Sequence, residues 1–165
     1  MAPGDLLVVI DDRQTTIEMA AGGTWTLPIG PVALLDTELD GSGRPAPEQL
    51  TNALGIVTDH LDDVIRESPT VEAAARVALA GPHARALARV EVGSDHVETD
   101  YELERAAADE VFRTLVAETV AERRHNPGLR PEEAETIIGT CCVVLALMRR
   151  LELTSVAIAP AGGDA

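Results

Sequence analysis

The chain of 165 residues contains no lysine, so arginine supplies all 13 of its Lys and Arg positions. Against these stand 28 Asp and Glu residues, which leave a net charge of −15. A surface this acidic repels nucleic acid and anionic membranes, and we therefore expect neither as a partner. It also disfavours free polyanions such as polyphosphate, unless a cation or a local cluster of arginines intervenes.

Aromatic residues are nearly absent as well. Trp25, Tyr101 and Phe112 are the only three, so Ala, Val and Leu must fill the core. A hydrophobic content of 45% and a charged content of 25% are ordinary for a soluble globular protein. The length suits one domain that buries a sizeable core.

The two cysteines are adjacent, and no run of apolar residues is long enough to span a bilayer. Cys141 and Cys142 lie in the longest apolar run, residues 137–148. Neighbours on a helix point about 100° apart, so a disulfide between them is not expected. They are interpreted as small buried hydrophobes in a reducing compartment. The first residues lack the basic segment of a secretory signal, and we expect a cytoplasmic protein.

The hydrophobic pattern predicts an α/β fold with a mixed sheet packed by helices. Residues 6–10, 15–20 and 24–29 are predicted to form a three-stranded antiparallel meander, with Gly22-Gly23 as a hairpin turn. The predicted order is βββ-α-α-β-α-α-α-β, in one domain over residues 1–160 with a flexible tail over 161–165. The later predicted helices are 32–39, 48–67, 83–90, 101–124 and 131–151, the later strands are 75–80 and 154–159, and the loops are 40–47 and 93–100.

The stretch from Asp11 to Met19 has the layout of an anion-binding strand–turn–strand unit. Asp11 closes the first strand and Glu18 lies in the second, so both are candidate ligands for a hydrated divalent cation. The turn between the strands should point backbone N–H groups at an anion, which normally requires glycine. Arg13, Gln14 and Thr15 stand there instead. The phosphate-binding site at this turn is therefore predicted to be vestigial.

Four further side chains or turns are candidates for anion contact, each with a plainer alternative. Arg13 can bind an anion with its guanidinium or pair on the surface with Asp12 or Glu18. Thr16 can donate to a phosphate or face solvent from a strand. Gly81-Pro82-His83 ends a strand and opens a helix, which is a natural anion site, although Pro82 removes one N–H. His83 is a ligand contact, a pH sensor or simply a helix-start residue.

Several motifs together resemble the exopolyphosphatase/guanosine pentaphosphate phosphohydrolase (Ppx/GppA) family. The family pattern D-I-G-G-G-S-T-E-L falls on residues 11–19, with its glycines on Arg13, Gln14 and Thr15, and its L-P-L-G-A-V-R-L resembles residues 27–34. G-T-A-T-x-L-A resembles residues 81–88, with the Gly kept and the Thr replaced by Pro82. P-G-L-x-P-x-R-A-D resembles residues 127–135, with Glu133 in place of the Arg.

The resemblance implies a fold and a lost activity. It implies a single actin-like (ribonuclease H-like) lobe, corresponding to the C-terminal half of the family's core. Family members hydrolyse phosphate between two lobes with a magnesium ion, and their general base lies on the other lobe some twenty residues before the D-I-G-G-G turn. Only ten residues precede Asp11 here. The first lobe and that base are therefore expected to be absent.

Two functions follow as expectations. The first is a catalytically inactive single-lobe protein that binds a partner or a small ligand, without a cofactor. The second is a magnesium-dependent exopolyphosphatase or guanosine pentaphosphate phosphohydrolase completed by a lobe from another chain. A homodimer or a protein partner is expected because a face around residues 28–35 and the last helices should expose apolar surface. The candidate residues are Arg13, Thr15, Thr16, Gly81 and His83 for phosphate or another ligand, and Asp11 and Glu18 for a metal.

Overall fold

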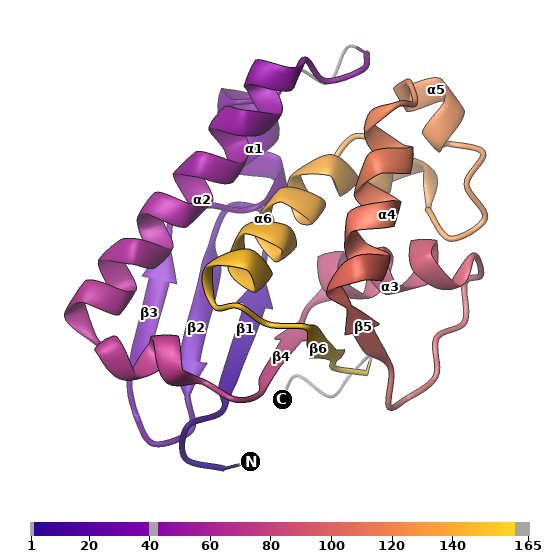
Figure 1. The fold of residues 1–165 in the computed structure, drawn as a ribbon. Helices are drawn as coiled ribbons and strands as arrows, with labels where there is room; N and C mark the ends of the chain where they lie inside the picture. Colours follow the sequence, from indigo (N-terminus) through magenta and orange to yellow (C-terminus); the bar gives the residue numbers. More distant parts are fainter. Residues whose placement is uncertain (1, 40–42, 161–165) are drawn as a thin grey trace.

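The computed structural model describes residues 2–39 and 43–160, which form one mixed six-stranded sheet with helices against it (Figure 1). The strand order is β3-β2-β1-β4-β6-β5. The first three strands form the predicted antiparallel meander, and β4 and β6 are parallel to β1 and β4 respectively. The strands are β1 Leu6–Ile10, β2 Thr15–Met19, β3 Thr24–Leu27, β4 Val77–Ala80, β5 Glu102–Glu104 and β6 Ser155–Ile158. The predicted tail 161–165 and part of the predicted loop 40–47 lie outside the described residues.

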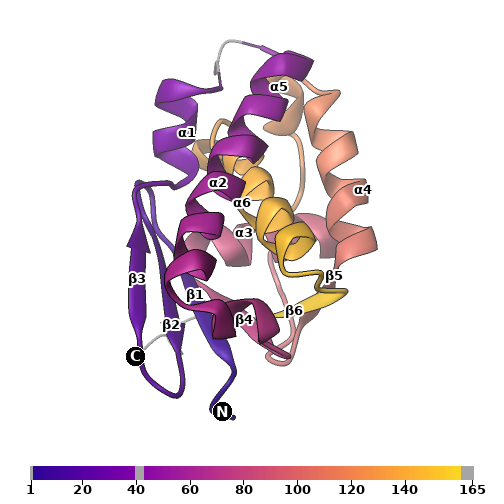
Figure 2. The same ribbon diagram turned by 60° about the vertical axis from the view of Figure 1, so that its left-hand side comes forward.

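The helices gather on one side of the sheet (Figures 1 and 2). They are α1 Pro31–Thr37, α2 Pro47–Glu67, α3 Pro82–Val92, α4 Arg105–Val116, α5 Val120–Arg123 and α6 Ile137–Arg150, with 3-10 turns at Pro69–Ala73 and Pro131–Glu133. Helix α6 is the centre, since it packs against α1, α2, α3 and α4. Within the described part of the chain, no helix has the length and apolar character needed to cross a membrane.

Successive side chains of each strand point to opposite sides of the sheet. One side, the core face, packs against the helices, and the opposite side is called the second face. Leu6, Val8 and Ile10 of β1 point to the helices and are fully buried. Leu7 and Val9 point the other way and are only half-buried, next to Glu18 and Thr16 of β2. Because every described helix lies on the core side, the second face carries no helical layer.

The predicted helix 101–124 is wrong, because three elements occupy that segment. Residues Glu102–Glu104 form β5, in which Leu103 is buried between two exposed glutamates and pairs with Val156 of β6. This two-residue alternation is the signature of a strand. A capping box then separates α4 from α5, since Thr119 accepts from the Glu122 N–H and the Glu122 carboxylate accepts from the Thr119 N–H.

The predicted helix 131–151 is also shorter in the structure. Pro131–Glu133 is a single 3-10 turn, and α6 begins at Ile137. The side chain of Glu133 accepts the Arg130 N–H and also binds Arg89, while the Ala134 carbonyl accepts from Arg123. These competing partners hold the 3-10 turn apart from α6.

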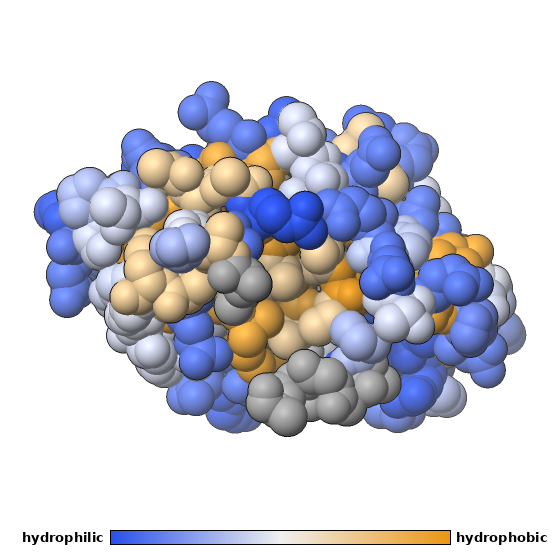
Figure 3. All heavy atoms as spheres, turned by 90° about the horizontal axis from the view of Figure 1, so that it is seen from below, coloured by the Kyte–Doolittle hydropathy of each residue, from blue (hydrophilic) through white to orange (hydrophobic). Residues whose placement is uncertain are grey.

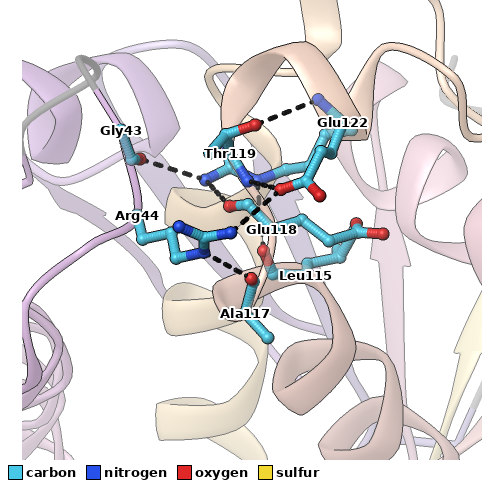
Figure 4. A network of polar contacts seen from close by, with 8 residues as sticks. Gly43, Arg44, Leu115, Ala117, Glu118, Thr119 and Glu122 are labelled. Atoms are coloured by element: carbon cyan, nitrogen blue, oxygen red, sulfur yellow. Dashed lines mark hydrogen bonds and ion pairs between the residues drawn. The ribbon is translucent and has the colours of Figure 1, made fainter.

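Arg123 is the most heavily bonded buried side chain among the described residues of this region. Figure 4 shows part of the surrounding network, in which Arg44 before α2 reaches Ala117 between α4 and α5. Arg123 is 2% exposed, and its guanidinium donates to the carbonyls of Leu115 at 3.2 Å, Ala134 at 2.7 Å, Glu118 at 3.1 Å and Gly43 at 3.5 Å. Burial lowers the pKa of Arg123, and the negative charge of Glu118 opposes that shift. The side chain thus joins α4, α5, the segment before α6 and the loop before α2.

Candidate functional site

The strands β1, β4 and β6 run in the same direction, so their carboxyl ends lie together at one end of the sheet. Asp11 follows β1, Gly81 follows β4 and Ala159 follows β6. In open α/β sheets, ligands bind at this end. The candidate residues from the two sequence motifs, the β1–β2 turn and the β4–α3 junction, therefore meet at the expected place.

The β1–β2 turn does not have the backbone of an anion nest. The Asp11 N–H donates to the Gln14 carbonyl at 2.9 Å, so the turn closes on itself. Among the described residues, Glu152 is the only one other than glycine with a positive φ. Asp12 and Arg13 therefore lack the left-handed conformation that alternates with right-handed residues in a nest. The turn therefore lacks the alternating backbone conformation from which such a nest is built.

The side chains of the turn are already engaged within the protein. Arg13 pairs with Asp36 of α1 at 2.8 Å, and both side chains are exposed. Arg13 thus forms a surface ion pair, but its partner is neither Asp12 nor Glu18. Thr15 is 3% exposed, and its hydroxyl donates to the Ile29 carbonyl at 2.9 Å. Thr16 points to the second face of the sheet, opposite Thr15.

Asp12 joins the turn to two helices. Its carbonyl accepts from the first N–H groups of α1, at 2.8 Å from Val32 and 3.3 Å from Ala33. Its carboxylate lies 2.6 Å from Nε2 of His83, at the start of α3. Asp12 is exposed. Its contact with His83 depends on the packing of β1 beside β4, so no local pattern in the sequence could have predicted it.

Two glycines allow the close approach of these segments. A Cβ on Gly30 would lie 2.3 Å from the Asp11 carbonyl oxygen and 2.5 Å from that of Asp12. Gly81 has a φ of 103°, and a Cβ there would lie 2.8 Å from the Ile10 carbonyl oxygen. Gly30 and Gly81, two of the glycines kept in the sequence motifs, are therefore explained by close backbone packing.

The two candidate metal ligands do not lie together. Glu18 pairs with Leu7 near the start of β1, whereas Asp11 follows the end of that strand. Four residues of β2 separate their positions, which corresponds to about 13 Å along an extended strand. Within residues 2–39 and 43–160, no group of three or more His, Cys, Asp or Glu side chains could hold a metal ion. These residues do not fit a magnesium ion shared by Asp11 and Glu18.

The cysteines have the buried, apolar surroundings that the sequence predicted. Cys141 and Cys142 are both free and fully buried in α6. Burial raises the pKa of the Cys142 thiol to about 12 and raises that of Cys141 further. Thiols of this kind are poor nucleophiles and poor metal ligands at neutral pH.

Neither a protein-family model nor a curated protein matches this sequence, but solved structures match its fold. The Ppx/GppA phosphatase of Aquifex aeolicus, in its type II crystal variant, superposes with a TM-score of 0.82 at 17% identity, covering 94% of this chain and 52% of that chain. An exopolyphosphatase-like protein gives a TM-score of 0.82 at 20% identity, with coverages of 96% and 56%. An exopolyphosphatase from Cytophaga hutchinsonii gives 0.79 at 14%, with coverages of 94% and 52%.

The superpositions establish the fold, and at identities this low they establish the fold alone. The chain spans about half the length of each structure that it matches. The sheet order, with an antiparallel meander followed by parallel strands, agrees with the fold that the sequence motifs implied. The described residues therefore form one α/β lobe with the actin-like fold seen in Ppx/GppA-type structures.

Proposed function

We propose that this protein is a non-hydrolysing relative of the Ppx/GppA-type phosphatases and acts as a binding or regulatory module. The observation that carries the proposal is the closed β1–β2 turn. Its N–H groups form no nest, Arg13 is paired with Asp36, and Thr15 is bonded to Ile29. A turn in this state offers a phosphoryl group no convergent set of donors.

The size of the expected loss supports inactivity. Removing a single donor that stabilises a transition state typically costs about a hundred- to a thousandfold in rate. Here the whole nest is replaced, and the two carboxylates proposed as metal ligands are separated along the strands. The combined loss exceeds what one remaining group such as Asp11 can offset.

A partner is part of the same proposal, although its place on the surface needs correction. The last long helix does not expose apolar surface, since residues Ile137 to Met148 are all buried, and Ile29, Pro31 and Leu34 are buried as well. The second face of the sheet is the better candidate, because no described helix covers Leu7 and Val9. On the side seen from below, apolar residues lie around a hydrophilic one near the centre (Figure 3).

The occupant that we propose for this face is a second copy of the chain. The strip formed by Leu7, Val9, Ala78 and Ala157 is apolar and half-buried, so two such strips can pack against each other about a two-fold axis. A hollow of about 500 Å³ adjoins the strip and is lined in part by Leu6, Val77 and Ala78. A cytoplasmic location also belongs to the proposal, and the two free cysteines support it.

A phosphate-release assay tests the proposal. Purified protein is incubated with magnesium and with polyphosphate, guanosine pentaphosphate or guanosine tetraphosphate, and we expect no turnover above the blank. Turnover that is abolished by Asp11→Ala would instead establish the magnesium-dependent phosphohydrolase. Arg66→Ala, which changes an exposed pair on α2, is the matched control for contaminating hydrolases. Turnover that survives Asp11→Ala at full rate reports a contaminant and leaves the expected result in place.

A further inference from the structure

A pocket of about 400 Å³ lies where β6 ends, next to Pro82 at the start of α3. Its walls are the first turns of α3, the segment 95–99 and the residues that end β6. None of the candidate residues Asp11, Arg13, Thr16, Gly81 or His83 lines it. The volume falls in the range of sites for small organic ligands.

Three of the 13 arginines meet at this pocket. Arg85 and Arg89 are one helical turn apart on α3, and Arg130 approaches from the segment before α6. Like charges at this helical spacing repel each other, so the arrangement is unfavourable without anions nearby. The acidic surface makes such a cluster unusual in this molecule, and a local cluster of arginines is the feature that lets an anion approach it.

The protein satisfies only part of this cluster. Arg89 is buried, and its Nη2 lies 2.9 and 2.7 Å from the two carboxylate oxygens of Glu133. Its Nε is also buried, yet it has no acceptor among the described residues. Neither Arg85 nor Arg130 forms an ion pair with any carboxylate in the described part of the chain. The guanidinium groups of Arg85 and Arg130 and the Nε–H of Arg89 are therefore available as hydrogen-bond donors.

The remaining walls determine what kind of anion fits. Val97, Ile158 and Pro160 provide apolar surface opposite the arginines. Asp95 and Glu98 also line the pocket and limit its positive charge. A long polyanion would place charge against these carboxylates, whereas a small anion with one charged group and an apolar body would not.

We infer that this pocket binds a small organic anion that carries one carboxylate or phosphate group. Arg85 and Arg130 hold the charged group, since planar guanidinium groups match the oxygen atoms of both kinds of anion. The charge of Arg89 is balanced by Glu133, and its buried Nε remains as a further donor. The apolar body lies along Val97 and Ile158. The site is independent of phosphate hydrolysis and of the β1–β2 turn.

The test is a titration of ¹⁵N-labelled protein with phenyl phosphate, benzoate or inorganic phosphate, followed by amide chemical shifts. We expect phenyl phosphate or benzoate to shift Val97 and Ala159, with saturation by about 10 mM, and whichever binds identifies the charged group. Inorganic phosphate should bind more weakly because it lacks the apolar body. Arg85→Ala and Arg130→Ala should each weaken binding about tenfold or more, and added salt should weaken it as well.

Arg66→Ala is the matched control, because Arg66 lies on the exposed surface of α2 away from the pocket. It should leave the affinity unchanged. No shift with either organic anion at about 10 mM would overturn the inference, as would shifts that both Arg85→Ala and Arg130→Ala leave unaltered. Tighter binding of polyphosphate than of phenyl phosphate would overturn the assignment of a small anion.

Discussion

Gly30 supports the β1–β2 turn through its missing side chain. Its φ of −164° is open to any residue, so the requirement is purely steric. We predict that Gly30→Ala lowers the free energy of unfolding by about 2 kcal/mol or more, because the added Cβ meets the carbonyl oxygens of Asp11 and Asp12. Urea denaturation monitored by circular dichroism measures the change.

The control for this substitution is Gly55→Ala in the middle of α2. Gly55 is exposed, and a Cβ there meets no atom within 4 Å. Because alanine favours the helix over glycine, this variant should gain about 1 kcal/mol. If Gly30→Ala is as stable as the parent protein, the turn is not held against α1 as described.

The buried thiols give the protein a stability that falls at alkaline pH. In the unfolded chain the cysteines lose their protons near pH 8.5, whereas burial raises the pKa of Cys142 to about 12 and that of Cys141 further in the folded state. The unfolded state therefore binds fewer protons above that pH, and stability declines as pH rises. The expected slope between about pH 9 and 10 is about 1.4 kcal/mol per pH unit for each thiol.

The absence of lysine makes this measurement unusually clean, since no lysine titrates in the same range. The pKa of Tyr101 is raised by burial and by its bond to Glu91, so Tyr101 adds to the decline only at higher pH. Urea titrations at several pH values give the slope, and Cys142→Ala should halve it. A flat profile in that range would mean that the thiols are not buried in the native state.

Only part of what the individual residues of the turn do could be predicted from the sequence. That Arg13, Gln14 and Thr15 fill positions of the glycine motif is visible in the order of residues, and it predicted a lost nest. The actual partners, Asp36 and Ile29, depend on how α1 packs on the turn. Arg85, Arg89 and Arg130 were missed because Arg130 is distant in sequence and no short motif joins it to α3.

At the scale of elements, Arg123 determines how α4, α5 and the segment before α6 are joined. We predict that Arg123→Ala lowers the free energy of unfolding by about 3 kcal/mol, because it leaves up to four carbonyls without their donor. Arg123→Lys should recover little of that loss, since an ammonium group cannot reach carbonyls arranged around a planar fork. Thermal and urea unfolding report both values.

Arg124 provides the neighbouring control. Its side chain is about half exposed and lies 3.9 Å from Glu135. Arg124→Ala should therefore change the stability by less than about 0.5 kcal/mol. Equal losses in the Arg123 and Arg124 variants would contradict the structural role assigned to the buried guanidinium.

The predictability of an element depended on whether its signal was local. The meander and the long amphipathic helix α2 were predicted within a few residues, because alternation, the Gly22-Gly23 turn and a regular apolar stripe are all local patterns. Strand β5 was missed because three residues carry little periodicity, and the strand exists only through its pairing with β6. The start of α6 was misplaced because long-range bonds to Arg89 and Arg123 set the turn before it.

At the scale of the whole molecule, high negative charge and an uncovered apolar face act against each other. The net charge of −15 on every copy opposes association, while the strip around Leu7 and Val9 favours it. Salt screens the repulsion and leaves the apolar contact intact, because the Debye length shrinks to about 3 Å near 1 M salt. The balance between the two effects can therefore be shifted by ionic strength alone.

We predict a dimer whose dissociation constant falls as sodium chloride is raised, measured by sedimentation equilibrium over a range of protein concentrations. Val9→Glu should weaken the dimer at every salt concentration, because it places a carboxylate within the apolar strip. Thr51→Glu adds the same charge on the exposed surface of α2 and should leave the affinity nearly unchanged. Circular dichroism confirms that both variants are folded. A monomer at every protein concentration, even where salt screens the repulsion between copies, would show that the second face of the sheet is not an interface between them.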